Sequence, residues 1–222
     1  MRRVSIRGGR FAEFVDGIEA TTGANKTMDV VIVGAADVAR SYYEGFYDPD
    51  NHTAPTCWSL DTQRPANDVP VSQKQALRCM DCRQNIRGSG SYGGRACRYF
   101  QRVAIVFEDR LDEVYQLQIP ASSIYGRATA GSRMPLQQYV NYIASRGELV
   151  SCILTRIYFD EQSSIPKLYF KPMRNLDNEE ILEVEDIMKD ESCSKAIAFT
   201  PEPSSTGKSL FETVDGFDIN AT

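Results

Sequence analysis

The sequence predicts a mainly β protein with one or two helices, built as a small antiparallel barrel that carries an insertion. About six segments alternate or run apolar as strands do, glycines punctuate them, and helical patterns do not follow each strand in turn. A regular alternation of strands and helices would instead indicate a parallel, doubly wound sheet. The chain has 222 residues, 42% of them apolar, and can bury a sizeable core.

The N-terminal segments predict two strands and a turn. RRVSIRGGRFAEFVDGIEA alternates loosely and is interrupted by glycines, so we expect a bulged or strongly bent strand there. MDVVIVGA, at 28–35, is a short apolar run that suits a buried strand. VARSYYEGFYDPDNH is aromatic and then turn-like at Asp48-Pro49-Asp50.

The C-terminal half predicts four strands and the helices. RYFQRVAIVFED and EVYQLQIPAS suit a hairpin, and ELVSCILTRIYFDEQSSIPKLYFKP suits two strands about a polar turn. MPLQQYVNYIASR, at 134–146, has helical spacing, with Pro135 in its first turn and Gly147 at its stop. DNEEILEVEDIMKDE predicts a second helix capped by Asp177.

An OB-type barrel is one architecture that fits this order of elements. We expect a single OB-type domain at 1–190 with a zinc-binding insertion at about 51–100. PEPSSTGKS and LFETVDGFDINAT indicate that 191–222 is a flexible linker with an acidic tail.

Four of the six cysteines lie close together, spaced Cys57-x21-Cys79-x2-Cys82-x14-Cys97. A Cys-x-x-Cys turn aims two sulfurs at one ion, and two further cysteines can complete the tetrahedral set that zinc prefers. The segment is poor in apolar residues, so metal ligation, at about 10–16 kcal/mol apparent, could supply its stability. We predict a structural Zn²⁺ on these four cysteines, with no open position for catalysis.

Three alternatives to this zinc site stay open. Cys79 and Cys82 could form a redox pair, all four could be inert thiols, or His52, the sole histidine, could replace Cys57 as a ligand. Structural disulfides are disfavoured because the basic start MRRVSIRGGRF has no apolar stretch after it. We therefore expect no signal peptide and a reducing compartment.

The cysteine segment is also basic and aromatic. Residues 83–102 include five arginines and no acidic residue. Arginine pairs with phosphates, and aromatic rings stack under unpaired bases for about 1–3 kcal/mol each, although single aromatic residues more often belong to a core. The residues predicted to contact nucleic acid are Arg40, Tyr42, Tyr43, Arg83, Arg87, Arg95, Arg98, Tyr99 and Phe100.

Charge is unevenly spread along the chain. Residues 177–222 hold 12 acidic residues against three lysines, a net −9, so the total of −5 leaves +4 on the first 176 residues. Such asymmetry suits a body that meets a polyanion and a tail that meets another partner. A solvated, partly disordered end is the plain alternative.

Signals of catalysis are scarce, and we expect no enzyme. One histidine leaves little room for triad chemistry, GSGSYGG follows no strand, and GIEATTGANKT lacks the Gly-Lys-Ser/Thr end of a phosphate loop. No apolar run approaches the roughly 20 residues that cross a bilayer. We expect no membrane partner and a cytoplasmic location, in the host cell if the protein is viral.

Several segments resemble a group of tailed-bacteriophage single-stranded-DNA-binding proteins. They are CWSLDTQRP, CMDCRQNIRGSG, GGRACRYFQRVAIV and LTRIYFDEQSSIPKLYFKP, together with the openings RRVSIRGGRF and MDVVIVGA, and they span roughly 2–185. The resemblance implies an OB-type core, a zinc-binding insertion and sequence-tolerant binding of unpaired DNA in phage replication. The group often has a proline and a tryptophan where this chain has Arg83 and Ile86.

By analogy with replication proteins of this kind, the acidic tail would recruit replication or recombination proteins, or shield the DNA groove. Its candidate contact residues are Phe211, Asp215, Phe217 and Asp218. The leading hypothesis is therefore a single-stranded-DNA-binding protein. The rivals are a zinc-stapled protein-interaction or transcription-regulatory module and, third, a zinc-dependent nuclease or primase accessory protein.

Overall fold

The computed structural model describes residues 1–20, 25–45, 54–90, 93–128 and 133–201. Within these ranges the fold is mainly β, as predicted, with one large mixed sheet and four α-helices. The strands are β1 (Arg2–Arg7), β2 (Arg10–Val15), β3 (Ile18–Glu19), β4 (Thr27–Ala35), β5 (Ala39–Tyr42), β6 (Cys57–Ser59), β7 (Arg98–Phe107), β8 (Arg110–Pro120), β9 (Ile153–Phe159) and β10 (Leu168–Asn175). The helices are α1 (Ala121–Ile124), α2 (Leu136–Ser145), α3 (Asn178–Lys189) and α4 (Glu191–Ile197), with short 3-10 turns η1 (Val71–Gln73), η2 (Cys79–Asp81), η3 (Arg83–Asn85) and η5 (Val150–Cys152).

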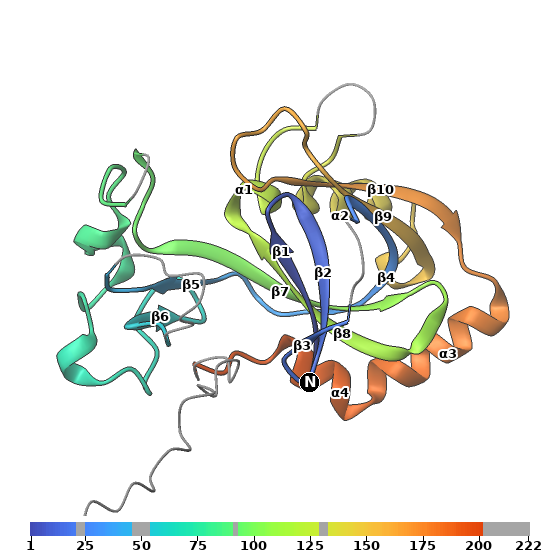
Figure 1. Cartoon of the computed structure of the whole chain (residues 1–222), viewed down its shortest axis with the longest axis horizontal. Helices are drawn as coiled ribbons and strands as arrows, with labels where there is room; N and C mark the ends of the chain where they lie inside the picture. The colour runs from blue at the N-terminus through green and yellow to red at the C-terminus, as the bar shows by residue number, and fades with distance from the viewer. Residues whose placement is uncertain (21–24, 46–53, 91–92, 129–132, 202–222) are drawn as a thin grey trace, which may run out of the picture.

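The sheet has the order β10-β9-β4-β7-β8-β1-β2-β3, with β5 and β6 joined to it through β7 (Figure 1). Adjacent strands of the sheet pair antiparallel, except that β1 runs parallel to β8. This corrects the wholly antiparallel barrel that the sequence predicts. One bridge between Phe11 and Asn25 brings β2 back towards β4. The sheet is therefore strongly curved without being clearly closed.

The first predicted strand is in fact a hairpin. Gly8 and Gly9 both have positive φ, 54° and 73°, and form a two-residue turn between β1 and β2. Positive φ at both central positions is the geometry that matches the twist of the flanking strands, and glycine adopts it without steric cost. The glycine pair thus marks a chain reversal, and the predicted bulge is wrong.

Both faces of the sheet are covered in part by helices. Leu136, Tyr139 and Ile143 of α2 join the larger core cluster on one face, and α3 and α4 cover a second cluster on the other (Figure 1). The two predicted helices are confirmed. Asp177 caps α3 by accepting hydrogen bonds from the Glu179 and Glu180 backbone amides.

The folded chain continues beyond residue 190, where the sequence placed a flexible tail. Residues 191–197 form α4, which buries Cys193 and Ala196 against the sheet. Gly34 of β4 makes room for this helix, because a Cβ there would lie 2.8 Å from Cys193 Sγ. The tail residues Phe211, Asp215, Phe217 and Asp218 lie outside the described residues.

The four clustered cysteines belong to a separate lobe, here called the cysteine lobe, made of residues 39–42, 54–90 and 93–97. β7 links it to the main sheet, because its first residues pair with β5 and its later residues pair with β4 (Figure 1). The lobe has few regular elements, namely β5, β6 and the turns η1 to η3. Among the described segments of the chain, no helix has both the length and the apolar character needed to cross a membrane.

Candidate metal centre and nucleic-acid interface

Three separate pieces of the cysteine lobe position the four cysteines. Cys57 opens β6 and pairs with Tyr42 of β5. Cys79 begins η2 and Cys82 is its C-cap, so the Cys-x-x-Cys stretch makes one tight turn in which the Cys82 amide lies 3.4 Å from the Cys79 carbonyl. Cys97 lies just ahead of β7, and its amide donates to the Gln84 carbonyl at 2.9 Å. Strand pairing and turn hydrogen bonds therefore bring distant cysteines into one lobe.

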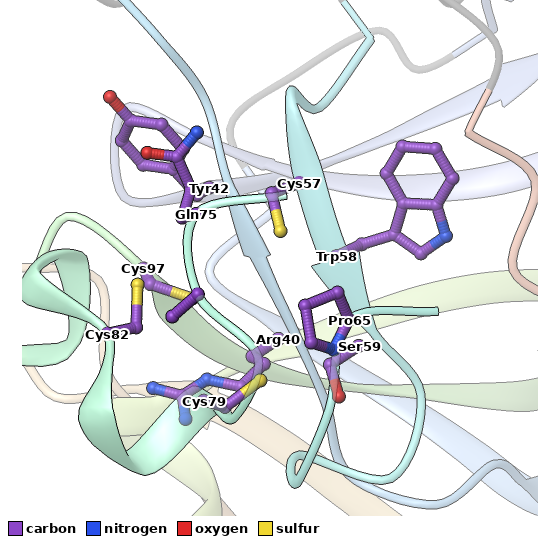
Figure 2. A pocket seen from close by; sticks show the side chains of 11 residues that line it. Arg40, Tyr42, Cys57, Trp58, Ser59, Pro65, Gln75, Cys79, Cys82 and Cys97 are labelled. Carbon is purple, nitrogen blue, oxygen red and sulfur yellow. The ribbon is translucent and has the colours of Figure 1, made fainter. Parts of the chain in front are cut away.

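All four side chains line the same pocket, as the sequence predicts from their spacing (Figure 2). Each is a free thiol and each is buried, with 7–9% of the residue exposed. Figure 2 shows them around Arg40, while the indole of Trp58 points away from them. Buried, unoxidised thiols on one pocket are the donor set that a structural zinc ion requires.

The lobe has little hydrophobic core of its own. Its buried cluster holds Cys57, Trp58 and Val69, with a few partly buried neighbours. Large apolar side chains stand exposed instead, including Leu77 at 93% and Met80 at 73%. So small a buried cluster cannot offset the conformational entropy of ordering this length of chain, which makes an additional cross-link physically reasonable.

Burial favours the neutral thiol form of Cys57 and Cys97 over the thiolate. Burial raises the pKa of Cys57, with backbone hydrogen bonding from Gln75 acting the other way. Burial also raises the pKa of Cys97 to about 11, and the neighbouring Arg40 guanidinium partly counteracts this. These two thiols are therefore neutral near pH 7, and a metal ion would have to displace their protons.

The types of side chain in the pocket suit a metal ion better than their positions do. Within the described ranges, no group of three or more His, Cys, Asp or Glu side chains is gathered closely enough to hold an ion. Zinc–sulfur bonds are about 2.3 Å long, so binding would draw the four sulfurs together. The alternative ligand His52 lies outside the described residues.

Arg40 does not occupy the position expected of a phosphate contact. It is 1% exposed, and its guanidinium is turned into the cysteine pocket (Figure 2). Strand alternation explains this, because Arg40 of β5 faces Ser59 of β6 and Tyr99 of β7 on the side of the ribbon that carries Cys57. The sequence prediction that Arg40 contacts DNA directly is therefore replaced below by a role inside the lobe.

The other predicted nucleic-acid contacts divide by exposure. Arg83, Arg87, Arg95 and Arg98 are exposed, and no ion pair links them to an acidic residue in the described structure. Tyr43 is 48% exposed, and Tyr42 is partly exposed. Tyr99 has the Arg40 guanidinium 4.3 Å from its ring centroid. Such unpaired cations are the ones a phosphate can use without first breaking a salt bridge.

Phe100 is buried and supports the junction between lobe and sheet. Its ring stacks on Phe199, 5.7 Å between centroids, and Phe199 also contacts Trp58 at 6.0 Å. Arg102 lies over Phe199 at 4.7 Å and donates to the Ala198 carbonyl. Phe199 and Asn85 were not predicted as site residues, because the first lies in the segment 191–222 predicted to be flexible and the second lies in a glycine-rich loop.

We compared the chain with protein-family models, curated proteins and solved structures, and none of the three comparisons gave a match.

Proposed function

We propose that this chain is a single-stranded-DNA-binding protein whose cysteine lobe is held by a structural zinc ion. One observation carries the proposal. Arg83, Arg87 and Arg95 on the cysteine lobe and Arg98 at the start of β7 are exposed beside the buried thiols, and they lack acidic partners in the described chain. Unpaired arginines beside partly exposed rings are the chemistry that binds a phosphate backbone and unstacked bases.

The proposed mechanism is backbone neutralisation with stacking. The four arginines contact phosphates, and Tyr43, together with Tyr42, supplies rings for unpaired bases. Phosphate contacts carry no sequence information, so binding is sequence-tolerant. We expect duplex DNA to bind more weakly, because its bases are already stacked on each other and cannot stack on the tyrosine rings.

The proposed core is an OB-type barrel. The strands β1, β2, β4, β7 and β8 follow one another around the curved sheet, and the Phe11–Asn25 bridge returns β2 to β4. This supports a partly open, five-stranded barrel of that type. The parallel pairing of β1 with β8 is a constraint that any such assignment has to accommodate.

The test is binding of fluorescent oligo(dT) and of a matched duplex, measured by anisotropy at several salt concentrations, with zinc content determined on the same samples. If each of the four arginines neutralises one phosphate, the log–log salt slope is about −2.8, because each phosphate contributes about −0.7 on a single strand. An Arg83→Gln/Arg87→Gln variant should therefore reduce the slope by about 1.4.

The matched control is Arg133→Gln. Arg133 is also exposed but precedes α2, away from the lobe, so its removal should leave the slope unchanged. Equal slopes for wild type and the Arg83/Arg87 variant, or equal affinity for duplex and single strand, would refute the proposal.

A second candidate function is a protein-interaction module. The observation that favours it is the set of exposed apolar side chains on the lobe: Val71, Leu77, Met80 and Ile86. Exposed apolar surface of this kind often marks a protein contact. A chain that binds one zinc ion but shows no salt-sensitive binding of oligo(dT) would favour this function over the first.

A further inference from the structure

The most unusual group of the cysteine lobe is the buried cation Arg40. Its backbone lies in β5 between two paired strands, so its side chain enters the lobe from the centre of a three-stranded ribbon. Only 1% of the residue is exposed. A guanidinium carries its charge at any physiological pH, so this position places a permanent positive charge inside a small, mostly irregular lobe.

The contacts of Arg40 do not neutralise that charge. Its Nη2 donates to Asn85 Oδ1, and its guanidinium carbon lies 4.3 Å from the Tyr99 ring centroid. Its Nε–H has no hydrogen-bond partner in the described structure, and none of the described carboxylates pairs with it. Burying an ion without a counter-ion is strongly unfavourable.

The pocket that Arg40 enters is also lined by the four cysteines, Cys57, Cys79, Cys82 and Cys97 (Figure 2). A cysteine that binds a metal does so as a thiolate. Four thiolates around one Zn²⁺ leave a net charge of about −2 in a buried site, which requires nearby hydrogen-bond donors and positive charge.

We propose that Arg40 is the positioning residue of the zinc centre, whose buried guanidinium donates hydrogen bonds to the cysteine sulfurs and offsets the negative charge of the four thiolates. This inference rests on the structural zinc of the proposed function. Burying the Arg40 guanidinium alone costs free energy, and so does burying the negatively charged zinc–thiolate centre alone. Placed side by side, the two opposite charges compensate each other. Arginine suits this role better than lysine because its several donors lie in one plane and reach more than one acceptor.

A purely structural role makes a different prediction. If Arg40 served only to pack on Tyr99 and to hold Asn85, its loss would weaken the metal-free and the zinc-loaded protein alike. If it is the counter-ion of the thiolates, its loss weakens the zinc-loaded form alone. In the metal-free form, replacing an unneutralised buried cation by an apolar side chain is neutral or stabilising.

The experiment compares wild type, Arg40→Met and Arg40→Lys in the full chain. Zinc affinity is measured by competition with a chelator, and thermal unfolding is followed with and without zinc. Arg40→Met should bind zinc about 10–100-fold more weakly, the usual cost of losing an outer-shell partner. Arg40→Lys keeps the charge and should lose less. Metal-free Arg40→Met should unfold at or above the wild-type temperature.

Cobalt supplies a spectroscopic readout that packing alone does not move. Hydrogen bonds to a thiolate hold its lone pairs at lower energy, so the loss of these hydrogen bonds in Co²⁺-loaded Arg40→Met should shift the sulfur-to-cobalt charge-transfer band to longer wavelength.

The matched control is Arg102→Met. Arg102 is also largely buried, has an unpartnered Nε–H and lies over an aromatic ring, yet the cysteine pocket does not include it. Its loss should shift the unfolding temperatures of the metal-free and the zinc-loaded forms by the same amount, and should leave zinc affinity and the cobalt band unchanged.

The outcomes separate the two claims. A wild-type protein that binds no zinc refutes the proposed centre before any variant is made. Zinc binding with wild-type affinity in both Arg40 variants, or equal destabilisation of both forms by Arg40→Met, refutes the role of Arg40 and leaves the zinc centre standing.

Discussion

Removing the ring of Phe199 should loosen the cysteine lobe from the main sheet while leaving the sheet intact. Phe199 lies just after α4 and joins the two parts of the molecule, because its ring contacts Trp58 of the lobe and Phe100 of β7. The Arg102 guanidinium lies 4.7 Å from the same ring. No other aromatic contact among the described residues joins the end of α4 to the lobe.

The expected loss follows from these three contacts. Each aromatic pair is worth about 0.5–1.5 kcal/mol, and a cation–π contact about 0.5–2 kcal/mol depending on its burial. Phe199→Ala should therefore destabilise the lobe by about 2–3 kcal/mol, allowing for incomplete additivity. With a urea m-value of about 2 kcal/mol/M, the midpoint of lobe unfolding moves down by about 1 M or slightly more.

The assay uses the single tryptophan of the chain. Trp58 is buried in the lobe, so its fluorescence reports unfolding of that part, whereas far-UV circular dichroism is dominated by the large sheet. In Phe199→Ala the fluorescence transition should precede the circular dichroism transition. Chains ended after Pro201 and after Ile197 provide a matched pair, since only the first retains Phe199. The reasoning is refuted if the fluorescence midpoint of Phe199→Ala equals that of wild type.

Two further predictions concern the packing and capping of α3 and α4. Gly34→Ala should cost about 1–3 kcal/mol of unfolding free energy, because the new Cβ would lie 2.8 Å from Cys193 Sγ, and Cys193→Ala in the same chain should recover most of that loss in a double-mutant cycle. Additive effects of the two substitutions would contradict the proposed clash. The pKa of Glu180 is lowered to about 2, first by hydrogen bonds from Arg174 and then by the Asp177 amide, so its contribution to stability is present above its ordinary value of 4.5 and lost as the pH falls from there towards 2. The unfolding temperature of Glu180→Gln should therefore lie below wild type at pH 6 and converge with it near pH 2, and a gap that persists at pH 2 would contradict this assignment.

Local patterns in the sequence predicted the local elements well. Asp177 caps α3, and α2 follows Pro135, because capping and helical periodicity depend on residues a few positions apart. The β7–β8 hairpin is confirmed for the same reason. The turn at Gly8-Gly9 was misread because paired glycines suit a bulge and a reversal equally, and only the partner strand decides between them.

Long-range placement was beyond sequence reasoning. The spacing of the cysteines indicated that they gather, but nothing near Arg40 indicated that strand pairing would bury its side chain among them. The string Arg40-Ser41-Tyr42-Tyr43 is typical of an exposed surface, and β6 and β7 cover part of it. Phe199 was missed because it follows α4, a helix whose burial depends on the gap left by Gly34.

The pairing of β5 with β7 has a consequence for how this protein can vary. The chain enters the cysteine lobe at the end of β5 and leaves it at the start of β7, and these strands are hydrogen-bonded neighbours, with Ser41 opposite Arg98. The ends of the intervening 56 residues, 42–97, are thus fixed side by side by the ladder itself. The main sheet sets no requirement on the length of that segment, since closing a longer loop between fixed ends costs little additional entropy. The lobe is therefore an exchangeable cassette: a related chain could carry a shorter, longer or metal-free module at this place while keeping the same sheet.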